Sequence, residues 1–564
     1  MTPNQNVRPH LNILSTEQIE YIHDRSLQIL SRIGVRVDSS RAMQVFTHSG
    51  GVKRQAEDRI LIEPGLVEWA IDATPSFIDI FNRHGEFAFR LGDSLPTACH
   101  YERSLRSNLD ISDNYQPHIQ DPDSGTENLK SSIENPKSQT RFGVGVTNLY
   151  YQDPLTEEVA PFSRKHMETS VRLGDRLPNY DLISTIGIIQ DYPPEVADLY
   201  AVLEMVANTT KPLVILISDE KLFLPALDLL DYLQSPNGQA QKLASQSSNI
   251  QTQNHVQTHN LVQTQNLASL PSNHLSSISN LKSFVIPYFN PVTPLIINRG
   301  TADKMLDAIQ RGLPLIYSNL SMAGMSTPIT SAGTLALLNA ELLAGLVLSQ
   351  LAREGAPVIL GSLPAFFDLK TMQDFYDPHT ILMNLACAEM MAHYRIPHAG
   401  TSGSGAGWGV DLLGGGLLWM NHLTACMGKV GLAPFVGGNF ASKVFSPALA
   451  VYSDEVIAQA WRFTQGFQLD DEWLGLDEIE RKGPGGSFLD TPLTLKHFRQ
   501  AYFESAIFPR LSLEKWEARN RPQAEQLLRE HTQQLLEDCR PPDDHDELIA
   551  RGEAFINRIH PRGG

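Results

Sequence analysis

Aromatic and amide side chains recur in the second half of the chain, each soon after a short apolar run. They are Tyr288, Phe289, Asn290, Asn319, Phe366, Phe367, Trp408, Phe435 and Asn439. Aromatic rings attract a quaternary or tertiary ammonium group through cation–π contact. A phosphorylated ligand would instead need a basic residue or a helix N-terminus with glycine spacing. If these side chains meet at one opening, they predict a pocket for a small methylated cation, with the amides holding its polar tail. Phenylalanine and tyrosine at such positions can equally be core residues.

A glycine-rich stretch, "HAGTSGSGAGWGVD" at 398–411, follows one of these apolar runs. His398 and Asp411 frame it and are the candidate catalytic residues. The backbone amides around Gly407 and Gly409 could bind the carboxylate of a betaine-like ligand. The alternative is that His398 is a hydrogen-bonded structural residue and that Asp411 caps the helix expected over 412–428. We interpret the stretch as the rim of an active site.

From residue 140 the chain alternates between expected strands and expected helices. The strands are expected at 141–149, 181–189, 212–218, 283–289, 313–319, 357–364, 397–403 and 433–439. These runs are continuously apolar, which predicts parallel strands buried on both faces. Eight such units favour a (β/α)8 TIM barrel, in which chemistry gathers at the carboxyl ends of the strands. The residues singled out above all follow such ends.

The flanking regions predict smaller appendages. Residues 1–139 are expected to form an N-terminal helix and an α+β lead-in. Ser15 and Gln18 are expected to form a capping box for that helix. Residues 140–465 form the expected barrel, and residues 466–564 a C-terminal helical segment that packs on it. Two polar stretches, 107–140 and 235–282, are too poor in apolar residues for a core and are interpreted as surface insertions.

Composition excludes several classes of protein. The chain has 564 residues and a formal net charge of -18, which disfavours nucleic acid and anionic membrane as partners. Its four cysteines lack CxxC spacing, so we expect neither a disulfide framework nor a zinc site, and no metal ligands. The apolar stretch 333–352 is expected to be a buried core helix, and the N-terminus lacks the apolar run of a secretory signal. A cytoplasmic location is predicted.

The sequence also resembles the trimethylamine methyltransferase family, which includes glycine betaine methyltransferases without pyrrolysine. The resemblance rests on "LSTEQIEYIHDRSLQILSRIGVRVDS" at 14–39, "NTTKPLVI" at 208–215, "NPVTPL" at 290–295, the long stretch 312–362, and "GPGGSFLDTPLTLKHFR" at 483–499. Members that act on trimethylamine resemble one another in carrying pyrrolysine. This sequence contains only standard residues and holds "TSGSGAGWGVDLLGGG" after the seventh expected strand.

The resemblance implies a TIM barrel that transfers a methyl group from a methylated amine to a cobalt(I) corrinoid (cobalamin). It implies that the corrinoid is supplied by a separate protein that docks at the barrel mouth, and that no cofactor is bound tightly. A homo-oligomer is expected. An alternative is a diverged member that binds a related ligand without methyl transfer. The motif at 483–499 could face either the barrel or a subunit interface.

Overall fold

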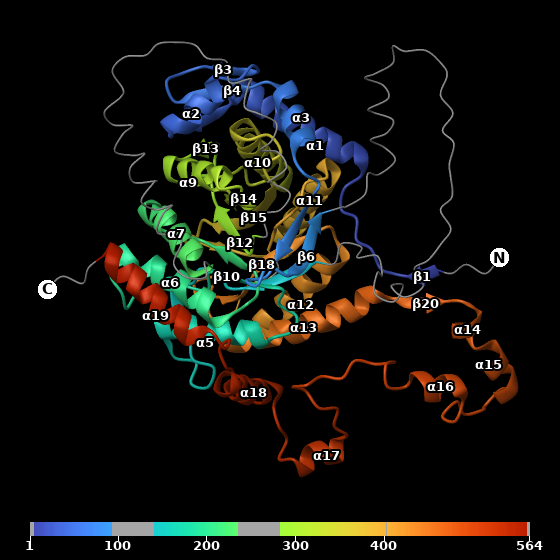
Figure 1. Ribbon diagram of the computed structural model, residues 1–564. Coiled ribbons are helices and arrows are strands. Elements are labelled where there is room, and N and C mark those ends of the chain that lie inside the picture. Colours follow the sequence, from blue (N-terminus) through green and yellow to red (C-terminus); the bar gives the residue numbers. More distant parts are fainter. Residues whose placement is uncertain (1–4, 93–139, 235–282, 402, 406, 561–564) are drawn as a thin grey trace, which may run out of the picture.

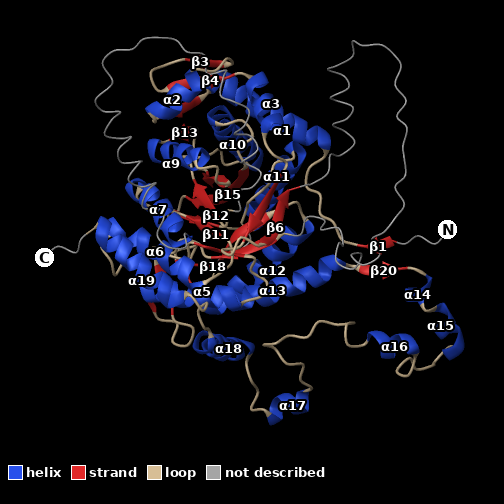
Figure 2. Cartoon of the chain, in the orientation of Figure 1, coloured by secondary structure: helices blue, strands red, loops and turns tan. Residues whose placement is uncertain are grey.

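The computed structural model describes residues 5–92, 140–234, 283–401, 403–405 and 407–560. The insertion expected at 235–282 lies outside the described residues, and of the one expected at 107–140 only Thr140 is described. The described residues form a mixed α/β structure around one large sheet (Figures 1 and 2).

The amino-terminal region consists of short elements that pack largely against one long helix, α10 (Ser331–Ala352). In order they are β1 (Gln5–Val7), α1 (Thr16–Gln28), the π-helical turn η1 (Ile29–Ile33), β2 (Val35–Val37), α2 (Ser40–Thr47), β3 (Val52–Arg54), β4 (Arg59–Ile62) and α3 (Pro64–Ala73). The predicted capping box of α1 is confirmed. The Ser15 side chain accepts a hydrogen bond from Gln18 N, and the Gln18 side chain accepts one from Ser15 N at 2.8 Å.

Seven strands of the large sheet run parallel to one another. In spatial order they are β15 (Val358–Asp368), β14 (Leu315–Ala323), β12 (Val285–Phe289), β11 (Leu213–Ile215), β10 (Leu182–Ser184), β7 (Arg141–Val144) and β18 (Leu432–Asn439). The segment 397–400 lies between the two ends of this series. Ala399 N donates to Leu360 O of β15 at 2.9 Å, and Gly400 N donates to Leu432 O of β18 at 2.8 Å. Both connections are parallel.

Short strands extend this sheet or pair elsewhere. They are β8 (Tyr150–Gln152), β9 (Val159–Pro161), β13 (Ile296–Ile297), β16 (Gln373–Phe375), β17 (Gly403–Ser404), β19 (Val444–Phe445) and β20 (Phe467–Leu469). Of these, β13 pairs with β2 and β20 pairs with β1, so the amino-terminal elements are tied to both the middle and the end of the chain.

Helices follow the parallel strands and cover the sheet from outside (Figure 2). They are α5 (Arg164–Arg176), α6 (Pro194–Asn208), η2 (Glu220–Leu222) with α7 (Phe223–Gln234), α9 (Arg299–Gln310), α10, α11 (Pro378–Tyr394), α12 (Leu412–Met427) and α13 (Pro447–Gln465). The C-terminal helices are α14 (Asp471–Leu474), α15 (Leu476–Lys482), α16 (Pro492–His497), α17 (Leu513–Ala518), α18 (Ala524–Asp538) and α19 (His545–Ile559). In the described part of the chain, α10 is long and apolar enough to cross a membrane, but it is mostly buried inside the protein, as a core helix should be.

Apolar side chains of the sheet separate into an outer and an inner cluster. The outer cluster lies between the strands and the helices. The inner cluster contains Leu182, Val214, Ile286, Tyr288, Ile316, Ile359, Ala399, Leu432 and Phe435. It also takes in Ile80 and Phe89 from a hairpin of β5 (Phe77–Phe81) and β6 (Phe87–Gly92). Successive residues of a strand point to opposite faces, so the alternation between the clusters follows the pleat.

The β5–β6 hairpin covers one end of the inner cluster. Phe81 N donates to Ser283 O, and Arg83 N donates to Thr210 O at 2.9 Å. Ser283 and Thr210 precede β12 and β11, so the hairpin lies at the amino ends of the strands. The candidate residues were expected at the opposite end of the cluster, at the carboxyl ends of the strands.

Candidate functional site

Two aromatic rings meet at the carboxyl-terminal part of the inner cluster. Tyr288 of β12 and Phe435 of β18 contact each other edge to face, with ring centres 4.9 Å apart. Asn290 Nδ2 lies 3.1 Å from the Tyr288 phenol oxygen and donates a second hydrogen bond to Ser318 O at 2.8 Å. Burial raises the pKa of Tyr288 to about 12, so the phenol is neutral at physiological pH. The structure thus brings together three of the predicted site residues.

A left-handed turn follows β18 at the same end of the sheet. Phe440, Ala441 and Ser442 have φ angles of 49°, 52° and 67° in succession, and none of them is a glycine. Each such residue costs of order 1 kcal/mol or more, and strained backbone of this kind clusters at functional sites. The turn is held from β7, because Asn148 Nδ2 donates to Ser442 O at 2.7 Å.

One polar atom at this turn, Asn148 Oδ1, is buried without a hydrogen-bond partner among the described residues. Ser442 Oγ is buried at the same turn, and its neighbour is the phenol of Tyr376. Buried polar atoms are almost always hydrogen-bonded, so each exception calls for an explanation such as a missing ligand or water. The Asn148 oxygen therefore marks a place where the polar end of a ligand could bind.

Tyr376, which the sequence did not single out, joins this group. It lies between β16 and α11, and its phenol approaches the side chain of Ser442. Burial raises its pKa, and its phenol is near enough to Tyr288 to help raise the pKa of that residue. It follows no apolar run, so the strand-end signal that marked the other aromatic residues is absent. Asn148 lies near the end of the strand expected at 141–149, so the strand-end signal does mark it.

Phe289 and Asn319 point away from this opening. Phe289 belongs to the outer cluster and contacts Phe223 of α7 at 5.6 Å between ring centres. Asn319 Nδ2 donates to Leu338 O and to Glu341 Oε2 of α10, both at 2.9 Å. Neighbouring residues of one strand face opposite sides, so Phe289 faces away from Tyr288. On β14 the same alternation places Asn319 on the side of Tyr317, in the outer cluster, and not on the side of Ile316.

Glu341 forms a buried polar centre behind β14. Its carboxylate accepts hydrogen bonds from Leu295 N, the Thr293 hydroxyl and Asn319 Nδ2. Burial raises the pKa of Glu341 to about 7 despite these donors. The carboxyl group fixes the loop after β12, which also carries Asn290.

His398 also lies outside the opening. Its neighbour Ala399 faces the inner cluster, while the His398 ring lies next to Gly400 and Asn384 of α11 on the outer side. Burial lowers the pKa of His398 to about 3, and neither ring nitrogen has a hydrogen-bond partner among the described residues. The position argues against the expectation that His398 is a catalytic residue, because the ring does not face the inner cluster.

Asp411 caps helix α12. Its carboxylate accepts hydrogen bonds from Gly414 N at 2.8 Å and from Trp408 N at 2.7 Å. A carboxylate occupied by two backbone donors at a helix start has a structural task. The capping alternative is thus confirmed.

The glycine-rich loop is tied to the strands beside it. Gln152 Nε2 donates to Trp408 O at 2.9 Å, and the amide groups of Asn439 and Gln152 meet at 2.8 Å. A side chain at Gly407 would meet the Asp411 carboxylate, and one at Gly409 would meet Gln152 and Glu157. Asn439 and the two glycines therefore position the loop. The Trp408 side chain, which the loop carries, is 65% exposed.

Phe366 and Phe367 lie in the extension of β15 that pairs with β16. Phe366 stacks on Phe375, with ring centres 5.9 Å apart. Both side chains are partly exposed, as expected for residues at a rim.

Exposed apolar side chains are frequent at and beyond the carboxyl ends of the strands, in loops, in the end of β14 and at the start of α12. They are Leu149, Val292, Leu320, Met325, Leu369, Met372, Trp408, Leu412 and Leu413. We call this set the apolar rim. Exposed apolar surface on this scale is typical of a site that binds another protein or a large ligand.

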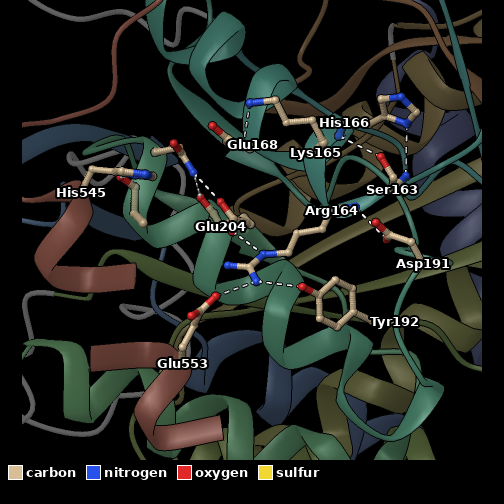
Figure 3. Close-up of polar contacts among 12 residues, drawn as sticks. Ser163, Arg164, Lys165, His166, Glu168, Asp191, Tyr192, Glu204, His545 and Glu553 are labelled. Atoms are coloured by element: carbon tan, nitrogen blue, oxygen red, sulfur yellow. Dashed lines mark hydrogen bonds and ion pairs between the residues drawn. The ribbon is translucent and has the colours of Figure 1, made fainter. Parts of the chain in front are cut away.

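A cavity of about 380 Å³ lies on the outer flank of the protein, between α5, α6 and α19 (Figure 3). Arg164 crosses it and bonds Glu204 at 2.6 Å, Glu553 at 2.8 Å and the Tyr192 hydroxyl at 3.1 Å. Because these charges are already paired, the cluster is best understood as the anchor that fastens α19 to the body.

The comparisons with known proteins identify a family. A family model described as "Trimethylamine methyltransferase (MTTB)" matches residues 2–95 and 275–564. The chain belongs to the trimethylamine methyltransferase family. The matched residues include Tyr288, Tyr376, Phe435 and Ser442, whereas Asn148 lies between the two matched parts.

Relatives within the trimethylamine methyltransferase family match over nearly the full length. A glycine betaine methyltransferase of Desulfitobacterium hafniense (strain Y51) is 23% identical over 551 residues, which are 97% of each chain. A trimethylamine methyltransferase MttB of D. hafniense (strain DSM 10664 / DCB-2) is 22% identical, covering 98% of this chain and 94% of the relative. Among solved structures, the monomethylamine methyltransferase MtmB of Methanosarcina barkeri covers 93% of this chain and 88% of its own, with 9% identity and a TM-score of 0.46.

Proposed function

We propose that the protein is a corrinoid-dependent methyltransferase that takes a methyl group from a quaternary, betaine-like amine. The acceptor is the cobalt(I) of a corrinoid carried by a separate protein. The observation that carries the proposal is the uncharged, aromatic opening formed by Tyr288, Phe435 and Tyr376 in a chain of this family. We also propose that the reaction takes place in the cytoplasm.

The proposed frame is a closed (β/α)8 barrel. Seven parallel strands and the segment 397–400 follow one another by hydrogen bonds, and β7 pairs with β18. The inner cluster takes an inward side chain from every strand except β7, which contributes only the partly buried Val146 just beyond its end. This arrangement supports a barrel whose amino end is closed by the β5–β6 hairpin and whose carboxyl end is the mouth.

The ammonium group is proposed to lie against Tyr288, Phe435 and Tyr376. Aromatic faces contribute about 0.5–2 kcal/mol to binding a cation, and more when the contact is dry. Asn290, Asn148 and Ser442 would hold the polar tail, because Asn148 Oδ1 is buried and unpartnered among the described residues and Ser442 Oγ belongs to the same turn. Trp408, Phe366 and Phe367 would form the outer wall.

The chemistry requires little from the protein beyond position. The C–N bond to the methyl group breaks, its electron pair remains on nitrogen, and a neutral tertiary amine leaves. Since no proton moves, neither a general acid nor a base is needed. His398 and Asp411 therefore have no part in the proposed reaction. The chain's task is to hold the N–CH3 bond toward the mouth and to exclude water.

The corrinoid supplies a strongly nucleophilic cobalt(I). Its carrier protein is proposed to dock on the apolar rim, whose exposed side chains lie at or beyond the carboxyl ends of the parallel strands. Replacing Leu412, which is 95% exposed, with glutamate should slow transfer to the corrinoid protein at least tenfold. Transfer to free cob(I)alamin should be unchanged by the same substitution, and this comparison separates docking from chemistry.

A substrate panel tests the function directly. Quaternary amines with and without a carboxylate are mixed with the protein and free cob(I)alamin, and methylation of the cobalt is followed by its absorbance. Turnover is expected with a betaine-like compound and not with trimethylamine. Thermal stabilisation by a panel member without any methyl transfer would instead identify a binding protein of the same family.

A further inference from the structure

Asn148 is held firmly beyond the end of β7. Its backbone N donates to Ile186 O and its backbone O accepts from Ile188 N, both at 2.9 Å. The preceding residue, Thr147, has a φ of 58°, which is a strained conformation for a β-branched residue. The Asn148 side chain is completely buried. The backbone on both sides therefore fixes the direction in which this amide points.

The Asn148 amide points to the inner side of the sheet. A Cβ atom added at Gly438 would lie 3.4 Å from Asn148 Nδ2 and 3.2 Å from Val146 Cγ2, and Val146 packs against the inner cluster. The amide is thus on the same side as Tyr288 and Phe435. Gly438 is not among the residues with a positive φ, so its backbone does not require glycine. The missing side chain instead leaves space beside the amide.

Hydrogen bonds decide which atom of this amide a ligand can use. Asn148 Nδ2 donates to Ser442 O at 2.7 Å, so the orientation of the amide is fixed. Asn148 Oδ1 is buried and has no hydrogen-bond partner among the described residues. The Ser442 hydroxyl has the Tyr376 phenol as its neighbour. An amide oxygen only accepts hydrogen bonds, so the group that Asn148 lacks is a donor.

Asn290 leaves the same kind of atom for a ligand. Its Nδ2 group has two hydrogens, which are directed to the Tyr288 phenol oxygen at 3.1 Å and to Ser318 O at 2.8 Å. The end of the Asn290 amide that remains is its oxygen. Both amides assigned to the tail of the substrate therefore offer acceptors.

A carboxylate is a poor match for these two amides. An ionised carboxylate accepts hydrogen bonds and donates none, so its oxygens would meet the two amide oxygens. The glycine-rich loop has already used two of its backbone donors. Trp408 N donates to Asp411 at 2.7 Å, and Gly405 N donates to Gly438 O at 3.2 Å. A hydroxyl group, in contrast, is uncharged and supplies the donor that is missing.

We propose that the preferred substrate is a quaternary amine whose tail carries a hydroxyl group, and that this hydroxyl donates a hydrogen bond to Asn148 Oδ1. The inference rests on the proposed function, because it takes the ammonium group to lie against the aromatic rings. Asn148 is then a specificity-determining residue that contacts the tail and takes no part in breaking the C–N bond. A site built to bond a hydroxyl discriminates strongly against an analogue without one, since the buried acceptor is then left unpaired.

A series of trimethylammonium compounds that differ only in the tail tests the proposal. The tails are 2-hydroxyethyl, n-propyl, 2-methoxyethyl and carboxymethyl, and tetramethylammonium serves as the compound without a tail. Calorimetry on the full chain without corrinoid gives each dissociation constant, and assays with free cob(I)alamin give each kcat/KM. The hydroxyethyl compound should bind and react at least about tenfold better than the propyl compound of equal size. The methoxyethyl and carboxymethyl compounds cannot donate and should react no faster than the propyl compound.

Substitutions then test whether Asn148 is the source of the preference. Asn148→Leu keeps the approximate size of the side chain and should reduce the ratio between the hydroxyethyl and propyl compounds to below about twofold. Tetramethylammonium should bind this variant as before. Asn319→Leu is the matched control, because it removes a buried amide that faces α10, and it should keep the ratio. Gly438→Ala fills the space beside the amide, so it should weaken every compound with a tail and spare tetramethylammonium.

The two readouts separate this inference from the proposed reaction. Preferential binding of the hydroxyethyl compound without methyl transfer would overturn the reaction and support the inference. Methyl transfer in which the propyl or carboxymethyl compound matches the hydroxyethyl compound would overturn the inference and support the reaction. An unchanged ratio in Asn148→Leu would remove the role of Asn148. If none of the compounds binds, both the reaction and the inference are wrong.

Discussion

The ring of Tyr288 meets the ring of Phe435 edge to face inside the sheet, with their centres 4.9 Å apart and their planes at 87°. The two residues lie 147 positions apart in the chain (435 minus 288), on strands that are not neighbours in the sheet. The contact therefore shows that side chains from distant strands converge in the inner cluster. The neighbouring residue Phe289 faces the opposite side and packs on Phe223.

This difference between adjacent residues makes a matched pair of variants. Tyr288→Ala should raise KM for a quaternary amine roughly 10- to 30-fold, because an aromatic contact with a cation contributes up to about 2 kcal/mol. Tyr288→Phe should keep most of the affinity. Phe289→Leu should lower stability by about 1 kcal/mol and leave KM unchanged. Initial rates with cob(I)alamin as acceptor give both constants. An equal KM for Tyr288→Ala and Phe289→Leu would remove Tyr288 from the binding site.

Replacement of His398 should affect stability and not catalysis. His398→Gln is expected to keep kcat/KM within about twofold, since the ring does not face the inner cluster. Because the folded-state pKa is about 3 and the unfolded value about 6.5, protonation favours the unfolded chain as pH falls below 6.5. Through His398, the free energy of unfolding should thus fall by about 2 kcal/mol as the pH is lowered from 7 to 5.

Urea unfolding of the two proteins at pH 7 and pH 5 measures the effect. The loss of unfolding free energy between these pH values should be smaller in His398→Gln than in the unmodified chain. A large fall in kcat for the variant, without a change in its unfolding, would restore a catalytic role for the ring.

Glu341 should make the free energy of unfolding change with pH in the opposite direction to His398. Its folded-state pKa of about 7 exceeds the unfolded value of 4.5, so the folded state holds a proton that the unfolded chain has released. The stabilisation is fully present below pH 4.5 and is lost as pH rises through 7, by roughly 2–3 kcal/mol between pH 5 and pH 8. Glu341→Gln should remove this loss.

Glu389 provides the control for this experiment. Its carboxylate also accepts backbone hydrogen bonds, from Ile13 N and Leu14 N at 2.6 Å, but it holds the amino-terminal segment. Glu389→Gln should leave the decline between pH 5 and pH 8 in place. If both variants retain it, Glu341 is not its source.

The strained backbone of the left-handed turn at 440–442 should lower the stability of the protein and support its activity. Ala441 has a φ of 52°, which glycine adopts without cost. Ala441→Gly should raise the unfolding free energy by as much as about 1 kcal/mol and lower kcat/KM several-fold, because Ser442 would be held less firmly. Ala441→Ser keeps a Cβ atom and should show no gain in stability. A glycine variant that is both less stable and fully active would contradict the idea that strain is stored there.

The sequence alone determined the family and the course of the main chain. Ser15 and Gln18 form their capping box because both partners lie within one helical turn, so local spacing suffices. Continuous apolar runs marked the parallel strands, and their ends marked the neighbourhood of Tyr288, Asn290 and Phe435. The capping of α12 by Asp411 was foreseen as an alternative for the same local reason.

Only the tertiary structure decided which side chains face the opening. In a strand buried on both faces, both sets of alternating residues are apolar, so the sequence carries no mark of which set points inward. Tyr288 and Ala399 point in, whereas Phe289 and His398 point out. Tyr376 and the turn that carries Ser442 reach the site through contacts with Tyr288 and Asn148, far away in the chain. Their positions depend on how the strands and loops assemble in space, which no local pattern records.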